Sequence, residues 1–225
     1  MSQKDVIKYY DSLAGNYDES RFENSYGQFL DAQERRVLDE LIDTLDEGFR
    51  LDLACGTGRL TNYATHGLDA SAAMLERARK RNPKVEYRLA SASQTGYPDE
   101  TFDLVYSFHF LMHMDEDTFR QVFAEVHRIL KRGGRFILDI PSKKRRRLFR
   151  HKQVSWHGGT ELSSRDIERM ISGKFLMGKR FGLMMMPIHK LPVKVRRPLQ
   201  KFDFRLANGW LKEYSSYLVF ELVKA

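Results

Sequence analysis

Between residues 50 and 141 the sequence alternates strand-like and helix-like segments, and this alternation restricts the fold more than any other feature. Short apolar runs with the composition of buried strands cover 51–54, a segment ending at Asp69, and 85–89, 102–106 and 135–140. Between them we expect a short helix over 59–64, a helix capped by Ser71, and an amphipathic helix from Phe119 to Leu130 that Gly133-Gly134 stops. This rhythm predicts a parallel, doubly wound α/β sheet.

The flanking segments extend this core into one domain of residues 1–225. Residues 1–47 predict a helical cap, broken near Gly15 and around 24–27, ahead of a cofactor-binding core over 48–141. Residues 142–225 form a basic, substrate-side segment, in which we expect a helix over 164–172 and strands over 180–186 and 214–223. A stretch rich in basic residues and proline separates these strands and runs to about Asn208. The sheet would then have seven strands.

Composition excludes several classes of protein. The chain has 42% hydrophobic and 30% charged residues, as in ordinary globular domains, and no apolar run approaches the ~20 residues of a membrane span. It has no signal-peptide pattern and one cysteine, which predicts a cytoplasmic location. No His/Cys cluster has metal-ligand spacing, so we expect no metal. Charge is uneven, with 18 Lys/Arg against 24 Asp/Glu in residues 1–142 but 20 against 6 in 143–225.

The stretch "LDLACGTGRLTNYATHGLDAS" (51–71) has most of a nucleotide-binding fingerprint. Gly56-Thr57-Gly58 follows a strand, and Asp69 ends the next strand, where a carboxylate can bind a ribose diol. In dinucleotide sites a third glycine would replace Thr61, and the carboxylate of Asp52 at the same turn would repel a pyrophosphate. The pattern predicts a ligand with a ribose, a positive centre and no phosphate, which S-adenosylmethionine satisfies.

"LDLACGTGRL" also resembles the first motif of the class I S-adenosylmethionine-dependent methyltransferases. "YYDSLAGNYDE" (9–19) is similar to the N-terminal signature of their small-molecule members, the type 11 branch that includes quinone-biosynthesis enzymes. "GLDASAAMLERAR", "YPDETFDLVYSFHFLMHM" and "ILKRGGRFILDIP" resemble three further motifs in the family's order, so the resemblance covers roughly residues 7–141. It implies a Rossmann-like seven-stranded sheet, mostly parallel with an antiparallel C-terminal strand and with helices on both faces.

The resemblance also implies which residues bind the cofactor, position by position. The glycine turn would lie beneath the methionine part, with Asp52 near its amino end, Asp69 on the ribose and the following residues around the adenine. The implied set is Tyr17, Asp52, Ala54, Gly56, Thr57, Gly58, Asp69, Ala70, Met74, Ser91, Ala92 and Ser107, with Tyr9 as a further candidate. Two departures are visible, since many relatives have an acid in place of Ser91 and only 17 residues separate Asp52 from Asp69.

Methyl transfer from a sulfonium needs a general base only when the acceptor loses a proton. His109 and His113, just past the fourth strand, are the catalytic candidates, either as a base or by orienting the acceptor. The alternative is that both pack at the start of the next helix, and His157 is a weaker candidate. Cys55 is expected to be a structural thiol, and Met184-Met185-Met186 fits a buried strand better than the wall of a ligand pocket.

"KKRRRLFRHK" (Lys143–Lys152) and a second basic stretch over 190–201 leave three interpretations open. They are a solvated face, a site for an anionic small substrate, or a surface for peripheral contact with an acidic membrane. Nucleic acid is a less economical partner. The leading hypothesis is a methyltransferase acting on a small-molecule or lipid-like acceptor. The alternatives are an RNA or protein methyltransferase with a basic clamp and a non-catalytic S-adenosylmethionine-binding module.

Overall fold

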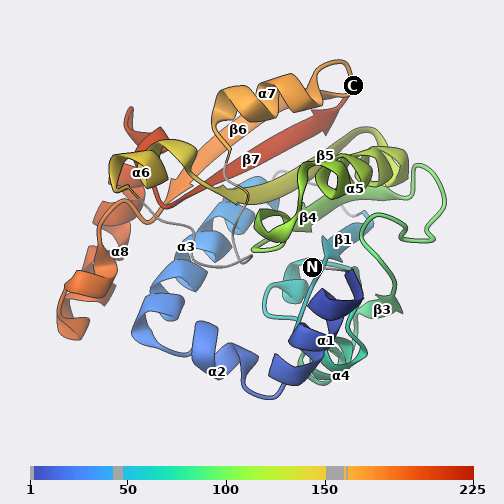
Figure 1. The fold of residues 1–225 in the computed structure, drawn as a ribbon, viewed down its shortest axis with the longest axis horizontal. Helices are drawn as coiled ribbons and strands as arrows, with labels where there is room; N and C mark the ends of the chain where they lie inside the picture. The colour runs from blue at the N-terminus through green and yellow to red at the C-terminus, as the bar shows by residue number, and fades with distance from the viewer. Residues whose placement is uncertain (1–2, 43–47, 151–159, 161) are drawn as a thin grey trace.

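The computed structural model describes residues 3–42, 48–150, 160 and 162–225. It contains a seven-stranded sheet of order β3-β2-β1-β4-β5-β7-β6, in which β7 runs antiparallel to both of its neighbours and the other pairs shown are parallel (Figure 1). The predicted fold class is confirmed. The strands are β1 Arg50–Leu53, β2 His66–Asp69, β3 Glu86–Leu89, β4 Phe102–Ser107, β5 Leu130–Pro141, β6 Phe175–Leu183 and β7 Tyr217–Lys224.

Helices cover both faces of this sheet. Their bounds are α1 Gln3–Leu13, α2 Tyr17–Arg21, α3 Ser25–Ile42, α4 Ala72–Arg81, α5 Glu116–Ile129, α6 Lys143–Leu148, α7 Ser164–Ile171 and α8 Val193–Ala207, with short 3-10 turns at Thr61–Tyr63, Leu111–His113, Ile188–Lys190 and Lys212–Tyr214. Ser71 caps α4 as expected, because its side chain accepts a hydrogen bond from the Met74 N–H at 3.1 Å. No helix in the described part of the chain is both long and apolar enough to cross a bilayer.

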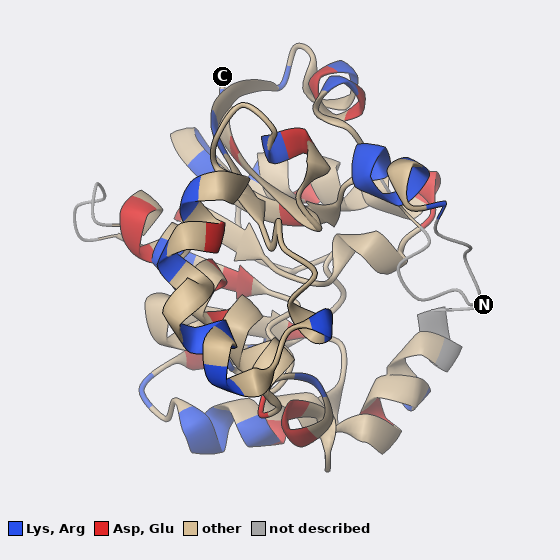
Figure 2. Cartoon of the chain, turned by 90° about the vertical axis from the view of Figure 1, so that its left-hand side faces the viewer, with Lys and Arg blue, Asp and Glu red and all other residues tan. Residues whose placement is uncertain are grey.

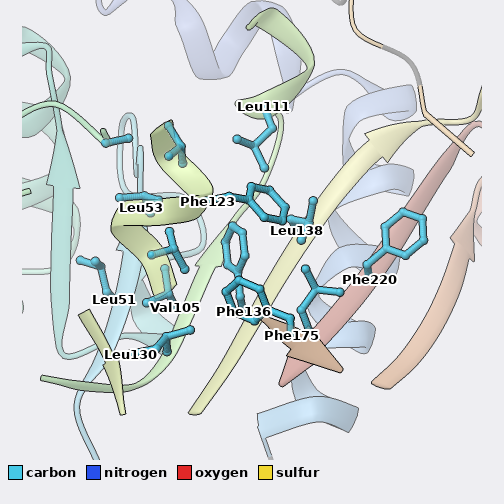
Figure 3. Close-up of a cluster of buried hydrophobic side chains, with 14 of the residues drawn as sticks. Leu51, Leu53, Val105, Leu111, Phe123, Leu130, Phe136, Leu138, Phe175 and Phe220 are labelled. Carbon is cyan, nitrogen blue, oxygen red and sulfur yellow. The ribbon is translucent and has the colours of Figure 1, made fainter. Parts of the chain in front are cut away.

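Alternation along the central strands builds a hydrophobic core on each face. Val105 points to the face covered by α5 and α7, where it joins the cluster of Figure 3, whereas its neighbours Leu104 and Tyr106 point to the face covered by α3 and α8. Phe136 and Ile137 divide between the two faces in the same way. The sheet is therefore buried on both sides, as the near-continuous apolar runs of its strands indicate.

The structure corrects the prediction of a helix over 59–64. Only the 3-10 turn Thr61–Tyr63 forms, because the chain between β1 and β2 is too short to hold a helix and Thr61 instead bonds back to β1 through Asp52. The expected helix stop at Gly133-Gly134 is also wrong. The helix ends at Ile129, and the two glycines lie inside β5.

One expectation in the C-terminal segment is also wrong. The sixth strand lies earlier than predicted and ends at Leu183, so the methionine triplet follows it. Met184 is nevertheless buried in the core with a positive φ of 58°, and its N–H bonds to the side chain of Gln33. The basic, proline-containing stretch is a 15-residue helix, α8, which includes Pro198. One face of this helix packs on α3 and β6, and that tertiary contact outweighs the local signal of proline.

Candidate functional site

The glycine turn follows β1 at the carboxyl edge of the sheet. Ala54, Gly56 and Gly58 all have positive φ, of 60°, 53° and 79°. A side chain on Gly56 would meet no atom within 4 Å, so this position faces open space. A Cβ on Gly58 would instead lie 2.9 Å from the Cα of Ala78 in α4. Gly58 thus allows the close helix packing for which dinucleotide sites use a third glycine, while Gly56 leaves room for a ligand.

Asp69 ends β2 and holds the turn in place. Its Oδ2 accepts the Gly56 N–H at 2.8 Å, and its Oδ1 accepts the Ser71 N–H at 2.9 Å. Burial raises the pKa of Asp69, although the backbone N–H groups of Ser71 and Gly56 oppose this shift. The carboxylate therefore lies directly beside the open space above Gly56, where it can accept further hydrogen bonds from a ligand's hydroxyl groups.

Asp52 lies beneath the same turn and is only 4% exposed. Its Oδ2 accepts a hydrogen bond from the Thr61 hydroxyl at 2.6 Å. Thr61, which stands where dinucleotide sites have a third glycine, therefore binds Asp52 in this protein. Burial raises the pKa of Asp52 to about 7, against the opposing effects of the Thr61 hydrogen bond and the cation of Arg59. A cationic ligand beside this carboxyl group would favour its ionised form.

Helix α2 covers the turn from the other side. The Thr57 hydroxyl donates to Asp18 Oδ1 at 2.6 Å, and Asp18 Oδ2 pairs with Arg81 at 2.9 Å, so one carboxylate links α2, the turn and the end of α4. Tyr17 and Phe22 line the remaining cavity, whose volume is about 50 Å³. Helix α2 and the residue that follows it therefore form one wall of the cavity beside the glycine turn.

A buried charge cluster borders this cavity. His109, with a positive φ of 58°, follows β4, and its backbone N–H donates to Asp139 Oδ1 at 2.7 Å. Its ring Nε2 lies 2.5 Å from Glu34 Oε1 and its Nδ1 lies 3.4 Å from Asp139 Oδ2. The other Glu34 oxygen pairs with Arg59 at 2.6 Å. Asp52, beneath the turn, lines the same cavity.

The pKa shifts of Glu34 and His109 favour their charged forms, whereas burial raises the pKa of Asp139 and favours its neutral form. Burial alone would raise the pKa of Glu34, but Arg59 and His109 lower it to about 2. Burial would likewise lower the pKa of His109, but the carboxylates of Glu34 and Asp139 raise it. The raised pKa favours the imidazolium form of His109, in which neither ring nitrogen has the free lone pair of a general base. It would need to lose a proton before it could accept one from a substrate.

The other expected site residues fall into different surroundings. Met74 is buried at the start of α4, Ala70 just before that helix is half-buried, and Ser91, after β3, is also half-buried. The Ala92 side chain packs in the hydrophobic core, and Ser107 Oγ donates to the Leu53 carbonyl at 2.7 Å. His113 lies in the 3-10 turn after β4, with its ring centroid 6.3 Å from that of Tyr10. His157 lies outside the described residues.

The site also contains residues that the sequence reasoning missed, chiefly Glu34, Arg59 and Asp139. Two of these residues could have been recognised from the sequence pattern. Glu34 is a charged residue on the apolar stripe of α3, between Leu30 and Val37, and is completely buried. Asp139 interrupts the apolar run of β5 and is 1% exposed. An acid inside a buried pattern indicates a buried partner, because an unpaired charge there is very costly.

Comparison with known proteins places the chain among methyltransferases. Residues 51–138 match the family model described as "Methyltransferase domain". The chain is 31% identical over 173 residues to the ubiquinone/menaquinone biosynthesis C-methyltransferase of Desulfotalea psychrophila, covering 72% of this chain and 69% of that one. It is 34% identical over 146 residues to the demethylmenaquinone methyltransferase of Thermotoga maritima, covering 61% of this chain and 62% of that one, less than two thirds.

The solved structures support the same fold. A crystal structure of an S-adenosylmethionine-dependent methyltransferase from Thermotoga maritima superimposes with a TM-score of 0.73 and 21% sequence identity. The match covers 97% of this chain and 99% of that one, and includes the C-terminal strands outside the family model. At this level of identity the likeness concerns the fold alone.

Proposed function

Because the chain belongs to the class I S-adenosylmethionine-dependent methyltransferases of the small-molecule type, we propose that it methylates a small-molecule or lipid-like acceptor by in-line displacement at the sulfonium methyl group. S-adenosylmethionine is the cofactor of this family. The single observation that carries the proposal is the open space above Gly56, bordered by the carboxylate of Asp69 and the buried carboxyl group of Asp52.

The described residues fit this cofactor. A ribose diol needs hydrogen-bond acceptors, which Asp69 supplies, and a sulfonium or ammonium group needs nearby negative charge, which Asp52 supplies. We further propose that Met74 and Ala70 contact the adenine, with Ser91 and Ala92 at its edge, and that Ser107 offers its backbone carbonyl to the amino group. Tyr17 would close over the bound cofactor from α2, with Ala54, Thr57 and Gly58 shaping the floor beneath it.

When bound, the cofactor supplies the electrophilic methyl group. The protein's own contribution is to align the acceptor and exclude water, and alignment can lower a barrier by about 7–11 kcal/mol. Tyr17 on α2 and Phe22 directly after it, which line the cavity, would do both. His109 and His113 remain the proposed groups for proton transfer or acceptor orientation.

The wall of the cavity supports an apolar or aromatic acceptor. Phe22, Leu60 and Phe108 line it, and the ring of Tyr217 lies 5.3 Å from that of His109. Farther out, Arg145 donates to the carbonyl oxygens of Met185 and Tyr214, at the start of the basic run Lys143–Lys152. We propose that this run attracts an anionic acceptor or contacts an acidic membrane.

Two measurements test the proposal. The first is a thermal shift with S-adenosylmethionine, in which the wild type should gain stability and Asp69→Ala should not. Asp117→Asn, an exposed carboxyl group on α5, is the matched control and should behave as the wild type. Absence of any shift in the wild type would contradict cofactor binding.

The second measurement is transfer of a labelled methyl group into a cell extract separated into lipid, small-molecule, RNA and protein pools. We expect label in the lipid or small-molecule pool. Label confined to RNA or protein would support the alternative hypothesis of a basic clamp and refute the proposed acceptor class.

A further inference from the structure

Helix α8 has an apolar stripe on its solvent side. Val195, Phe202 and Leu206 are 41%, 58% and 39% exposed. Their spacing of seven and four residues places them on one side of an α-helix, with the half-exposed Leu199 between them. The opposite side, with Phe204 and Ala207, is buried and faces α3 and β6. The helix is therefore apolar on two sides, and only one of them is covered in the structure.

A basic stripe lies beside the apolar one. Lys194, Arg197, Lys201 and Arg205 are all exposed and recur at intervals of three or four residues. Within the described ranges none of the four forms an ion pair. The single carboxylate of α8, Asp203, is buried, where it accepts hydrogen bonds from the Gln33 side chain and from backbone N–H groups after β6. Nothing on the helix neutralises the exposed stripe.

The same side of the molecule continues this combination of charge and apolar surface. Trp210, just after α8, is 91% exposed, the highest value among the large hydrophobic residues described. Phe149, after the basic helix α6, is 68% exposed. Arg145 of α6 donates to the Tyr214 carbonyl at 2.8 Å, which ties α6 to the turn that follows Trp210. Figure 2 is turned toward this side and shows its Lys and Arg positions.

We propose that α8 and Trp210 form a docking surface for an anionic lipid bilayer. Adjacent stripes of Lys/Arg and of Phe, Leu and Trp are the pattern of a helix that lies in a membrane interface, with its apolar side among the acyl chains and its cations at the headgroups. A second copy of this chain is a poorer occupant, because two basic stripes would face each other. A nucleic acid would leave the Val195, Phe202 and Leu206 stripe uncovered.

The start of α8 contacts a segment that borders the candidate active site. Arg196, near the start of α8, donates to the Ser25 hydroxyl at 2.7 Å. Ser25 begins α3, directly after the segment with Phe22, which lines the cavity. Docking through α8 would thus bring the segment with Phe22 near the bilayer. The docking surface does not depend on the identity of the acceptor, so it can be tested separately from methyl transfer.

The test is flotation of the full chain with vesicles of neutral phosphatidylcholine, with and without about a third phosphatidylglycerol. We expect binding to the anionic vesicles only, and release by high salt. Lys201→Gln with Arg205→Gln should weaken binding about 10- to 30-fold, at about fivefold for each cation. Replacing two residues of the apolar stripe, in Phe202→Ser with Leu206→Ser, should abolish flotation. All four side chains are exposed, so these variants should keep the wild-type melting temperature.

Arg79→Gln with Lys84→Gln is the control that separates this surface from net charge. It removes the same charge from exposed positions beside β3, at the opposite edge of the sheet from β6, and should leave flotation unchanged. In a Trp156→Phe background Trp210 is the only remaining tryptophan, and its emission should shift to the blue when anionic vesicles are added.

Failure of the wild type to float would overturn the proposal, as would an equal loss in the control variant. Binding to a homopolymeric RNA without binding to vesicles would assign the surface to nucleic acid instead. Concentration-dependent dimerisation that Phe202→Ser abolishes would assign it to a second copy. Neither outcome would bear on S-adenosylmethionine binding, which the thermal shift measures.

Discussion

Asp52→Asn should stabilise the ligand-free protein at alkaline pH while weakening cofactor binding. Burial raises the pKa of Asp52 from 3.8 to about 7. A raised carboxyl pKa means that the folded protein favours the protonated form, so its contribution to stability is complete below about pH 4. This contribution is then lost as the pH rises toward 7. At 1.36 kcal/mol per pKa unit, ionising Asp52 in the folded protein costs about 4 kcal/mol.

The asparagine side chain is neutral at every pH and can still accept the hydrogen bond from Thr61. The difference in unfolding free energy between the variant and the wild type should therefore grow by about 3 kcal/mol between pH 5 and pH 8.5. Urea denaturation followed by circular dichroism at these two pH values measures it. A difference that does not change with pH would refute the reasoning, because it would mean that Asp52 titrates alike in the folded and unfolded chains.

Cofactor binding should depend on pH in the opposite direction from the stability of the ligand-free protein. A cation beside Asp52 favours the ionised carboxylate, so affinity for S-adenosylmethionine should rise with pH toward 7 and binding near pH 6.5 should release a proton. Isothermal titration calorimetry in buffers of different ionisation enthalpy counts this proton. Asp52→Asn should bind weakly and release none. Equal affinity in the variant would show that the carboxylate does not face the positive centre.

The two glycines of the turn can be compared by alanine substitution. Gly56→Ala should fold, at a cost of about 1 kcal/mol for its positive φ, but should lose affinity for S-adenosylmethionine. Gly58→Ala should instead lower the melting temperature, because the added Cβ would clash with α4. Asp69→Asn should retain part of the thermal shift that Asp69→Ala loses, as measured by scanning fluorimetry. Glu34→Gln should destabilise the fold by about 3–5 kcal/mol in urea denaturation, because it leaves the buried cation of Arg59 without its carboxylate.

Periodicity and motif order were sufficient to predict the sheet, because each core strand and its helix are specified by neighbouring residues. The failures came where distant contacts decide. The segment with Thr61 has the composition of a helix, but its length and the bond to Asp52 allow only one turn. Helix α8 was hidden by Pro198, and its formation depends on packing against α3, which lies about 170 positions earlier, as the 2.7 Å bond between Gln33 and Asp203 shows.

The candidate site divides in the same way. Gly56 and Asp69 were found because a single stretch of sequence contains both the turn and the acid that bonds to it. The partners of His109, Glu34 and Arg59, were missed because the three residues come from segments that only the folded sheet brings together. A local pattern can show that Glu34 is out of place on an apolar helix face, but it cannot name the partner.

The distribution of charge connects the site to the exposed surface. Asp52 lines the cavity, Asp69 bonds to the glycine turn beside it, and the cluster around His109 balances its own carboxylates with Arg59. The exposed side of α8 is positively charged, and the helix itself has no exposed carboxylate to offset that charge. At moderate ionic strength, salt screens exposed charges over about 10 Å and buried charges much less. As the salt concentration rises, we therefore expect the protein to lose its binding to anionic vesicles well before it loses its binding to S-adenosylmethionine.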